Sequence, residues 1–534
     1  MLWAAERAGQ RTGKFHRLPG LCCLCLPLIA PGAAALAQDA APVKQWLEQH
    51  NRSGLAMKAQ DAAWYDSANG EEFRAWHAAV DAYLKHPSGT TADDALAAAQ
   101  VLRLYRVTQK AEYYTAASRM RDAFAAACPG PDTKAACAAA APFLAEYAEV
   151  FHEPDALGPI ADELLKRAKT EPDARMAMAL VDALGFFPDN RAESAAMKAA
   201  LAETVSSALQ AATKKADVED RALLVYAVLK GARRGYLPAV DAVRALRVWR
   251  AMPEPLGGGA PGAARLLAAT EVDLAPDAQL ARGKTILIDA WFNSQTRKNA
   301  AGQTVLFHYK WDDYSDSGFS LLGHMFRGVG MRTGTLAEAP TQANLRGAQY
   351  FMIVSPDIPV KNPHPHYMTE QDADEVAAWV EKGGVLILME NDPPNADLDH
   401  LNLLADKFGI HFDDVLHHHV LGEQVESGRI PVAADGPIFH APHTFYMKDT
   451  CAISLHGAAR ALLRDRGDVV MAEARHGHGL VFAVVDPWLY NEYTDGRKIP
   501  PQIYAQFDNF AGGRELVRWL ARQPRVAGTG AGTR

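Results

Sequence analysis

Cysteine is scarce in this sequence, with six residues in 534. Three of the six lie within residues 1–37, a segment that we expect to be removed from the mature protein. Cys128 and Cys137 flank a Pro-Gly-Pro turn and are expected to form a disulfide in an oxidising compartment. Cys451 is left over, and we interpret it as a small buried apolar residue rather than as a nucleophile.

Long hydrophobic runs are also rare. The run Leu18 to Ala30 follows four basic residues and precedes Ala35-Leu36-Ala37, a small-x-small cleavage pattern. It contains two prolines and is shorter than the roughly 20 residues of a membrane span, so residues 1–37 are predicted to be a signal peptide. No later stretch is predicted to cross a membrane, and a periplasmic or secreted location is expected.

Basic residues are not in excess, because 55 Lys and Arg face 63 Asp and Glu. Loss of the signal peptide removes four cations and one anion and shifts the formal net charge from −8 to −11. A mildly acidic chain without a basic stripe has no electrostatic reason to bind nucleic acid. No cofactor is expected. No metal is expected either, since the adjacent His417, His418 and His419 cannot all face one ion from a regular element.

Strand signals are nearly missing from residues 41–270. Thr91 and Asp94 form a capping-box start, and the apolar residues that follow recur with the period of a helix. Similar periods continue to about residue 234, and helices of this length joined by short turns stack as hairpins into a toroid or solenoid. Pro253 to Gly262 is rich in Pro and Gly and is interpreted as a linker.

Residues 283–524 have a different pattern, in which short apolar runs end in polar residues. These runs are 285–288, 351–354, 385–389 and 480–485. The segment 369–382 is an amphipathic helix that precedes the third run, as in a β-α-β unit. We therefore predict a Rossmann-like three-layer α/β domain with a parallel sheet, followed by a disordered tail at 525–534.

Three segments of the helical half resemble one enzyme family. The segments 142–150 (PFLAEYAEV), 177–188 (AMALVDALGFFP) and 225–238 (VYAVLKGARRGYLP) resemble the unsaturated rhamnogalacturonyl hydrolases, glycoside hydrolase family 105. The resemblance implies an (α/α)6 six-hairpin toroid and a role in pectin breakdown. It also implies a catalytic Asp that protonates the C4=C5 bond of an unsaturated uronic acid before water adds.

The sequence departs from this family where the catalytic Asp is expected. Counting back from Pro142 places that position at Ala135, and alanine cannot donate a proton. Loops of the family are missing between residues 165 and 177, so the toroid is expected to be truncated and degenerate, with a pocket that does not close. The acids Glu146, Asp182, Glu219 and Asp220 are interpreted as helix-face or cap residues.

Motifs of the second half resemble the C-terminal domain appended to some family 105 hydrolases, which is similar in fold to class I glutamine amidotransferases. These motifs are 308–313 (HYKWDD), 391–392 (ND) and 486–493 (DPWLYNEY). Glutamine hydrolysis requires a Cys in a tight turn after a central strand. Glu390 follows the run 385–389 instead, so amidotransferase activity is not expected.

The carboxyl ends of parallel strands share one edge of a sheet, where ligands bind. Polar and aromatic residues near this predicted edge have the chemistry of a sugar site. The predicted substrate-binding residues are Asp289, Asn293, Trp311, Asn391, Asp392, Asp486, Trp488, Asn491, Glu492 and Arg497, and the candidate catalytic residues are His308, Asp312 and Asp392. Core packing of the aromatics and a scaffold role for the loop 486–497 remain alternatives.

Two functions remain open from the sequence. The first is hydrolysis of uronic-acid-containing oligosaccharides, as the family resemblance implies. The second is a non-catalytic glycan-binding or scaffolding protein, which the missing acid at Ala135 favours. The sequence gives no indication of an oligomeric state.

Overall fold

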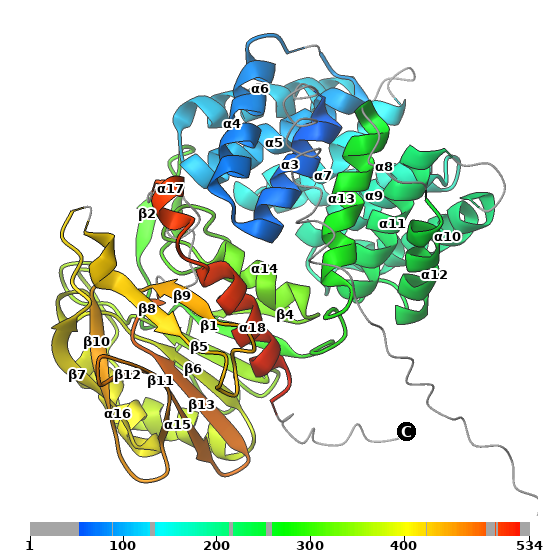
Figure 1. Ribbon diagram of the computed structural model, residues 1–534. Coiled ribbons are helices and arrows are strands. Elements are labelled where there is room, and N and C mark those ends of the chain that lie inside the picture. Colours follow the sequence, from blue (N-terminus) through cyan, green and yellow to red (C-terminus); the bar gives the residue numbers. More distant parts are fainter. Residues whose placement is uncertain are drawn as a thin grey trace, which may run out of the picture.

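The computed structural model describes residues 53–87, 89–128, 134–212, 217–252, 259–422, 424–487, 497 and 500–523. The predicted signal peptide and C-terminal tail lie outside this range. The described chain has a helical region followed by an α/β region (Figure 1). None of the described helices is long and apolar enough to cross a membrane.

The helical region is built from helices with short connections. The helices are α3 (Gly54–Ser67), α4 (Gly70–Leu84), α5 (Ala92–Thr108), α6 (Ala111–Ala127), α7 (Lys134–Val150), α8 (Leu157–Ala168), α9 (Ala174–Ala183), α10 (Ala192–Ala212), α11 (Val218–Arg233), α12 (Ala239–Arg250) and α13 (Gly259–Leu274). Two 3-10 turns, Pro154–Ala156 and Leu184–Phe186, precede α8 and follow α9. The predicted capping box of α5 is confirmed, since the Thr91 side chain accepts from the Asp94 N–H and the Asp94 side chain accepts from the Thr91 N–H.

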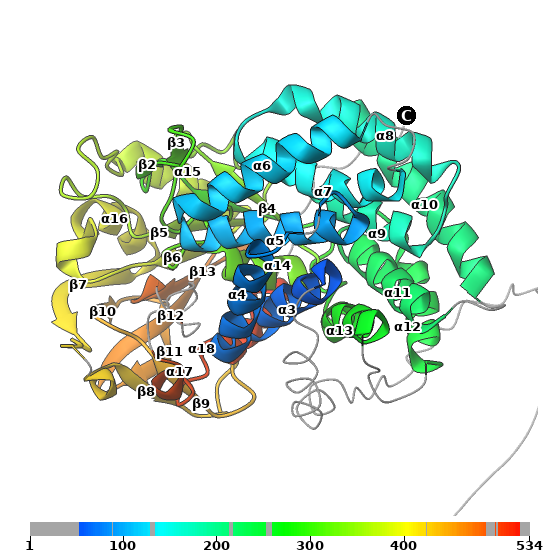
Figure 2. The ribbon, with the colours of Figure 1, turned by 90° about the horizontal axis from the view of Figure 1, so that it is seen from above.

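Alternate helices form a closed ring. In the described part of the chain, α3, α5, α7, α9, α11 and α13 each pack on the next, and α13 packs on α3 (Figure 2). Helices α4, α6, α8, α10 and α12 pack outside them. The expectation of a truncated toroid with an open pocket is therefore wrong. The ring is closed by α13, which begins inside the Pro/Gly-rich segment that the sequence suggested as a linker.

A disulfide joins Cys128, at the end of α6, to Cys137 in α7, with 5.3 Å between their Cα atoms. Cys451 is buried in the α/β region and is the one free cysteine among the described residues.

The α/β region contains one large mixed sheet. Its strands are β4 (Arg332–Leu336), β1 (Thr285–Asp289), β5 (Tyr350–Val354), β6 (Val385–Met389), β13 (Gly479–Val484), β12 (Asp468–His476), β10 (Thr450–Leu455) and β7 (Ile410–His417), in that spatial order, with β11 (Arg460–Asp465) also paired to β12. Two hairpins lie outside this sheet: β2 (Thr296–Lys298) with β3 (Thr304–Leu306), and β8 (Arg429–Val432) with β9 (His443–Tyr446).

The four predicted strands are neighbours in this sheet. They are β1, β5, β6 and β13, and each pairs with the next in parallel. Residues of β5 and β6 are buried on both faces, as their continuous apolar runs predict. The sheet extends further than predicted, because β4 adds a parallel edge strand and β12, β10, β7 and β11 add an antiparallel half.

Helices cover both faces of the sheet. Helices α15 (Glu370–Glu381) and α16 (Leu398–Ala405) pack together on one face, while α14 (Ser320–Gly328) and α18 (Asn509–Ala521) lie between the sheet and the helical ring (Figure 1). The short elements are α17 (Pro501–Tyr504) and the 3-10 turns Pro393–Asn395, Asp406–Phe408 and Val425–Gly428.

Polar contacts join the two regions through α18 and the β2–β3 hairpin. Arg514 of α18 forms an ion pair with Asp273 at 2.7 Å, and Arg518 pairs with Asp277. Gln303, in the turn between β2 and β3, donates to the carbonyl of Phe151 at 2.6 Å. These contacts place the loops that follow β3 against the open end of the ring.

Candidate functional site

A cavity of about 380 Å³ lies where the helical ring meets the α/β region. Its ring residues lie on all six inner helices, mostly in their C-terminal halves, or just beyond their ends. The charged and aromatic ring residues are Lys58, Asp61, Tyr65, Arg103, Arg106, Glu146, Glu149, Asp182, Phe186, Tyr226, Lys230, Arg233, Arg234 and Glu271. The α/β region contributes Asp312, Tyr314, His324, Arg327 and Thr333. The cavity is therefore lined by both regions.

The position of the cations follows from the direction of the inner helices. The C-terminal end of a helix carries a partial negative charge, which favours Lys and Arg in the last turn. Arg106 lies near the end of α5, Lys230 and Arg233 lie in the last turn of α11, and Arg234 is its C-cap. Positive charge is thereby concentrated at the ends of α5 and α11 that border the cavity.

Asp182 lies at the centre of one buried cluster in the wall. Its carboxylate forms ion pairs with Lys58 at 2.8 Å and Lys230 at 2.6 Å and accepts a hydrogen bond from the Tyr226 hydroxyl at 2.7 Å. Burial alone would raise the pKa of Asp182, but the two lysines lower it well below its usual value. Asp182 is therefore a fully partnered anion that fixes the wall, and not a proton donor.

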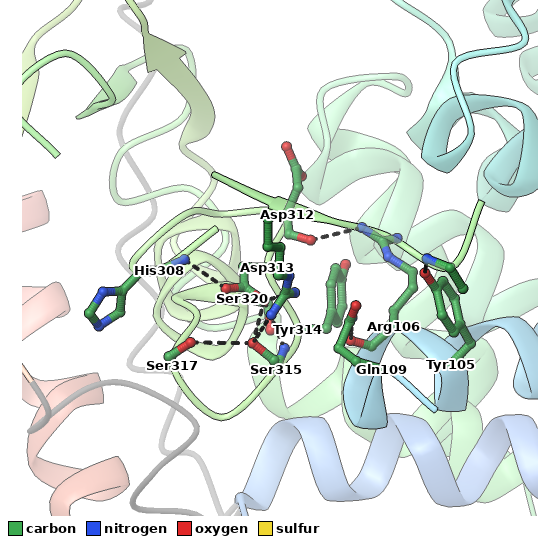
Figure 3. Close-up of polar contacts among 12 residues, drawn as sticks. Tyr105, Arg106, Gln109, His308, Asp312, Asp313, Tyr314, Ser315, Ser317 and Ser320 are labelled. Carbon is green, nitrogen blue, oxygen red and sulfur yellow. Dashed lines mark hydrogen bonds and ion pairs between the residues drawn. The ribbon is translucent and has the colours of Figure 1, made fainter. Parts of the chain in front are cut away.

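Tyr314 enters the ring from the α/β region and lies over two arginines. Its ring centre is 4.3 Å from the Arg103 guanidinium carbon and 4.0 Å from that of Arg106. Arg106 also pairs with Glu146 at 2.8 Å and donates to the Asp312 carbonyl at 3.3 Å, as Figure 3 shows in part. These contacts hold the loop from residue 308 to 320 against α5 and α7.

The shape of this loop depends on Asp313. The carboxylate of Asp313 accepts hydrogen bonds from the His308 N–H at 2.9 Å and from the Ser315 N–H at 3.0 Å, and it pairs with Arg297 at 3.0 Å. A Cβ at Gly318 would lie 1.8 Å from the Asp313 carbonyl oxygen, so only glycine fits this close approach. With Asp313 buried, its two neighbours Asp312 and Tyr314 line the cavity.

Glu149 and Asp312 form a pair of carboxylates in the cavity. Both side chains are exposed to the cavity, and neither carboxylate has a hydrogen bond or ion pair within the described residues. Although Glu149 is open to the cavity, protein surrounds it, and this burial raises its pKa to about 7, opposed by Arg106 and reinforced by Asp312 and Glu146. Glu149 can therefore hold a proton near neutral pH beside a second carboxyl group, an arrangement suited to acid and base catalysis.

The residues predicted at the sheet edge mostly have structural contacts. Asp289, 1% exposed, accepts from three backbone N–H groups of the turn that follows β1, at 2.9 to 3.2 Å. Asn293 donates to the Ser355 carbonyl at 2.9 Å and accepts from the buried ammonium of Lys310 at 3.0 Å. These two side chains close turns at the carboxyl ends of β1 and β5, and neither lines the cavity.

Asn391, Asp392 and Asp486 are buried as well. Asp392 accepts from the Asn395 amide at 2.7 and 2.9 Å, and its N–H donates to the Asn391 side chain at 2.9 Å. Asp486 accepts from the Lys448 N–H at 2.8 Å. The three lie at the ends of β6 and β13, as predicted, but outside the cavity.

The aromatic candidate Trp311 is a core residue rather than a stacking surface. It is 2% exposed, its indole N–H donates to the Gly334 carbonyl at 2.9 Å, and it packs against Phe319 and Phe326. Its ring therefore has no open face for a sugar. Trp488, Asn491 and Glu492 lie outside the described residues.

Three further candidates differ in their relation to the cavity. Asp312 lines it, whereas His308 is half-buried beside Gln295 and does not. Arg497 stabilises the loop 308–320, since it donates a hydrogen bond to the Tyr314 carbonyl at 3.0 Å. Of the predicted catalytic residues, only Asp312 is thus part of the cavity.

The position of Ala135 has a different meaning from the one that the family resemblance suggested. Ala135 is exposed at the N-terminal end of α7, while the cavity is lined by Pro142, Glu146 and Glu149 in the C-terminal part of the same helix. Its lack of a carboxylate therefore says nothing about the cavity. Glu146 and Asp182, interpreted from the sequence as helix-face residues, line the cavity, and each is paired there, Glu146 with Arg106 and Asp182 with Lys58 and Lys230. The cavity acid that the sequence analysis missed is Glu149. Its spacing of three residues from Glu146 in the otherwise apolar segment 142–150 was the available signal.

No family model and no curated protein matches the sequence. Solved structures that resemble parts of it include a glycosyl hydrolase family 88 protein from Bacteroides vulgatus, with 11% identity, a TM-score of 0.37 and coverage of 45% of this chain and 99% of that one. A possible GH105 family member from Salmonella enterica serovar Paratyphi A has 12% identity, a TM-score of 0.36 and coverage of 43% and 82%. The N-terminal domain of mmIFT52 has 15% identity, a TM-score of 0.30 and coverage of 42% and 99%. With scores this low, functional assignment rests on the chemistry of the cavity.

Proposed function

We propose that this protein is a carbohydrate-active enzyme that binds an acidic saccharide in the ring cavity and hydrolyses it with Glu149 as the general acid. The observation that carries the proposal is the pair Glu149 and Asp312, two carboxylates without bonding partners among the described residues, in a cavity bordered by seven lysine and arginine side chains. A cavity of about 380 Å³ has the size of a small-molecule site. Its excess of cations suits a uronic-acid-containing oligosaccharide.

The roles of the two carboxylates follow from their surroundings. Glu149 has a raised pKa and is protonated up to about neutral pH, so it can donate a proton to the saccharide. Asp312 lies in the cavity loop of the α/β region and can accept a proton from the attacking water. For an unsaturated uronyl residue, which the sequence resemblance implies, Glu149 would protonate the C=C bond and Asp312 would activate the water that adds.

Replacement of Glu149 by Gln tests this proposal. Glu149→Gln removes the proton donor but retains the shape and polarity of the side chain, so turnover of an unsaturated uronyl disaccharide should fall by about 10²–10⁴. Loss of the ultraviolet absorbance of the C=C bond measures turnover. The matched control is Glu203→Gln on the exposed side of α10, which should leave turnover unchanged.

A non-catalytic glycan-binding protein is the second candidate. The pairing of most other acids in the cavity favours this candidate, as when Asp182 pairs with Lys58 and Lys230. Paired acids are not available to transfer protons, so only Glu149 and Asp312 remain for catalysis. Binding of acidic saccharides by the wild-type protein, without turnover of any of them, would establish this alternative and refute the catalytic role of Glu149.

A further inference from the structure

Two arginines that line the cavity form no ion pair or hydrogen bond with a carboxylate within the described residues. Arg327 of α14 donates only to neutral oxygens, the Thr333 hydroxyl at 3.3 Å and the Ser320 carbonyl at 3.4 Å. The side chain of Arg234, half-buried at the end of α11, has no hydrogen bond or ion pair there.

The other cavity arginines differ, because each has a carboxylate. Arg233 pairs with Glu271 at 2.5 Å, Arg106 pairs with Glu146 at 2.8 Å, and Arg103 pairs with an aspartate of α3 at 3.3 Å. Within the described chain, Arg234 and Arg327 are thus the cavity guanidinium groups with unused capacity for an anion.

The fold brings these two arginines, from different regions, to the wall of the same cavity. Arg233, next to Arg234 in the chain, donates to the Arg327 carbonyl at 3.2 Å and so joins the C-terminal ends of α11 and α14. A Cβ at Gly323 would lie 2.9 Å from Nη1 of Arg327 and 3.1 Å from the Trp311 ring. The missing side chain at Gly323 therefore leaves the space that the Arg327 guanidinium occupies, next to the buried Trp311 ring.

The electrostatics of this pair also favour a bound anion. Burial, together with the nearby positive charge of Arg234, lowers the pKa of Arg327 to about 10, although Tyr314, Tyr65 and Asp312 oppose this shift. Two positive charges close together in a partly buried place repel each other, and an anion between them would relieve this repulsion. Guanidinium groups bind carboxylates in a planar, two-bond geometry.

We infer that Arg234 and Arg327 form the subsite that binds the carboxylate of a hexuronate residue of the substrate. The inference rests on the proposed function and extends it. It assigns recognition of the substrate carboxylate to one arginine from each region. The α/β region is then part of the binding site rather than an attached support, and substrate preference requires both regions in place.

The test compares the binding of D-galacturonate, D-galactose and acetate to the full-length mature protein by calorimetry. The wild-type protein should bind galacturonate at least about tenfold more tightly than galactose, because one charged group gains two charge-assisted hydrogen bonds. Arg234→Leu and Arg327→Leu should each remove this preference and leave galactose binding unchanged. Arg346→Leu, at an exposed position away from the cavity, is the matched control and should keep the preference.

The outcomes separate the inference from the proposed function. A galacturonate preference that persists in both Leu variants overturns the subsite. If neither sugar binds the wild-type protein but acetate binds and requires both arginines, the saccharide function fails and the anion site stands. Circular dichroism checks the fold of each variant, and Arg327→Gln replaces Arg327→Leu if the latter does not fold, with the same loss of preference expected.

Discussion

The guanidinium carbon of Arg106 lies 4.0 Å from the ring centre of Tyr314, although one residue belongs to the helical ring and the other to the α/β region. Arg103 lies over the same ring at 4.3 Å. Cation–π contacts of this kind contribute about 0.5–2 kcal/mol each, depending on their desolvation. These contacts hold the α/β region against the helical ring at the cavity, and they should contribute to the stability of the protein.

Removal of the Tyr314 ring should therefore destabilise the protein. Tyr314→Ala is expected to lower the free energy of unfolding by about 1–3 kcal/mol, because both cation–π contacts and the packing of the ring are lost. Tyr314→Phe keeps the ring and should cost little. Urea unfolding of the three proteins measures the effect, and equal stabilities of the Ala and Phe variants would contradict it.

The buried ion pair between Arg233 and Glu271 should also be sensitive to mutation. Two bonds of 2.8 and 2.5 Å join the groups, and both side chains are buried. Glu271→Ala leaves Arg233 as an uncompensated buried charge, so a loss of about 3–5 kcal/mol in unfolding free energy is expected. Thermal and urea unfolding check this, with Glu203→Ala as an exposed control that should stay within about 0.5 kcal/mol.

Glu390 should make stability depend on pH. It is fully buried at the end of β6, neither carboxylate oxygen has a hydrogen-bond partner among the described residues, and burial raises its pKa well above the usual value. The folded protein therefore retains a proton that the unfolded chain loses above about pH 4.3. Stability should fall by about 1.4 kcal/mol per pH unit above this value until the folded pKa is reached.

Glu390→Gln should remove this contribution and make the protein more stable than wild type at pH 7, with the difference shrinking toward pH 4. The measurement is the free energy of unfolding from pH 4 to 8. Glu338→Gln, at an exposed position, should reproduce the wild-type dependence. If Glu390→Gln also keeps the wild-type pH dependence, Glu390 does not titrate as inferred.

The pKa of Glu149 predicts the alkaline limb of activity. As a general acid, Glu149 must be protonated, so kcat/KM should fall as the pH rises through about 7. Asp312→Asn removes one of the charges that raise this pKa, so in any residual activity the limb should move to lower pH. The limb should be missing from the residual activity of Glu149→Gln. If the alkaline limb persists in Glu149→Gln, it arises from the titration of another group.

The parallel strands could be predicted because each is a short apolar run buried on both faces. The edge strand β4 (RTGTL) could not be predicted. An exposed edge strand needs few apolar residues, and this segment has no continuous apolar run. The antiparallel half could not be predicted because its pairing, as between β10 and β7, depends on contacts between segments distant in the chain.

The cavity was not predictable for a related reason. Its helical residues are spread over six inner helices, each of which contributes one or more polar side chains to an otherwise apolar face. Only ring closure by α3 and α13 brings them together. Asp312 was found because it lies in a polar motif, whereas Trp311 in the same motif satisfies its indole N–H inside the core. Sequence position alone could not separate these neighbours.

The location of the bound saccharide tests the central claim most directly. A crystal structure of Glu149→Gln with an unsaturated uronyl disaccharide should show the sugar in the ring cavity, within hydrogen-bond distance of residue 149 and with its carboxylate on Arg234 and Arg327. A saccharide bound instead at the edge of the sheet, beside Asp289 and Asp392, with an empty ring cavity, would contradict the assignment of the cavity as the functional site.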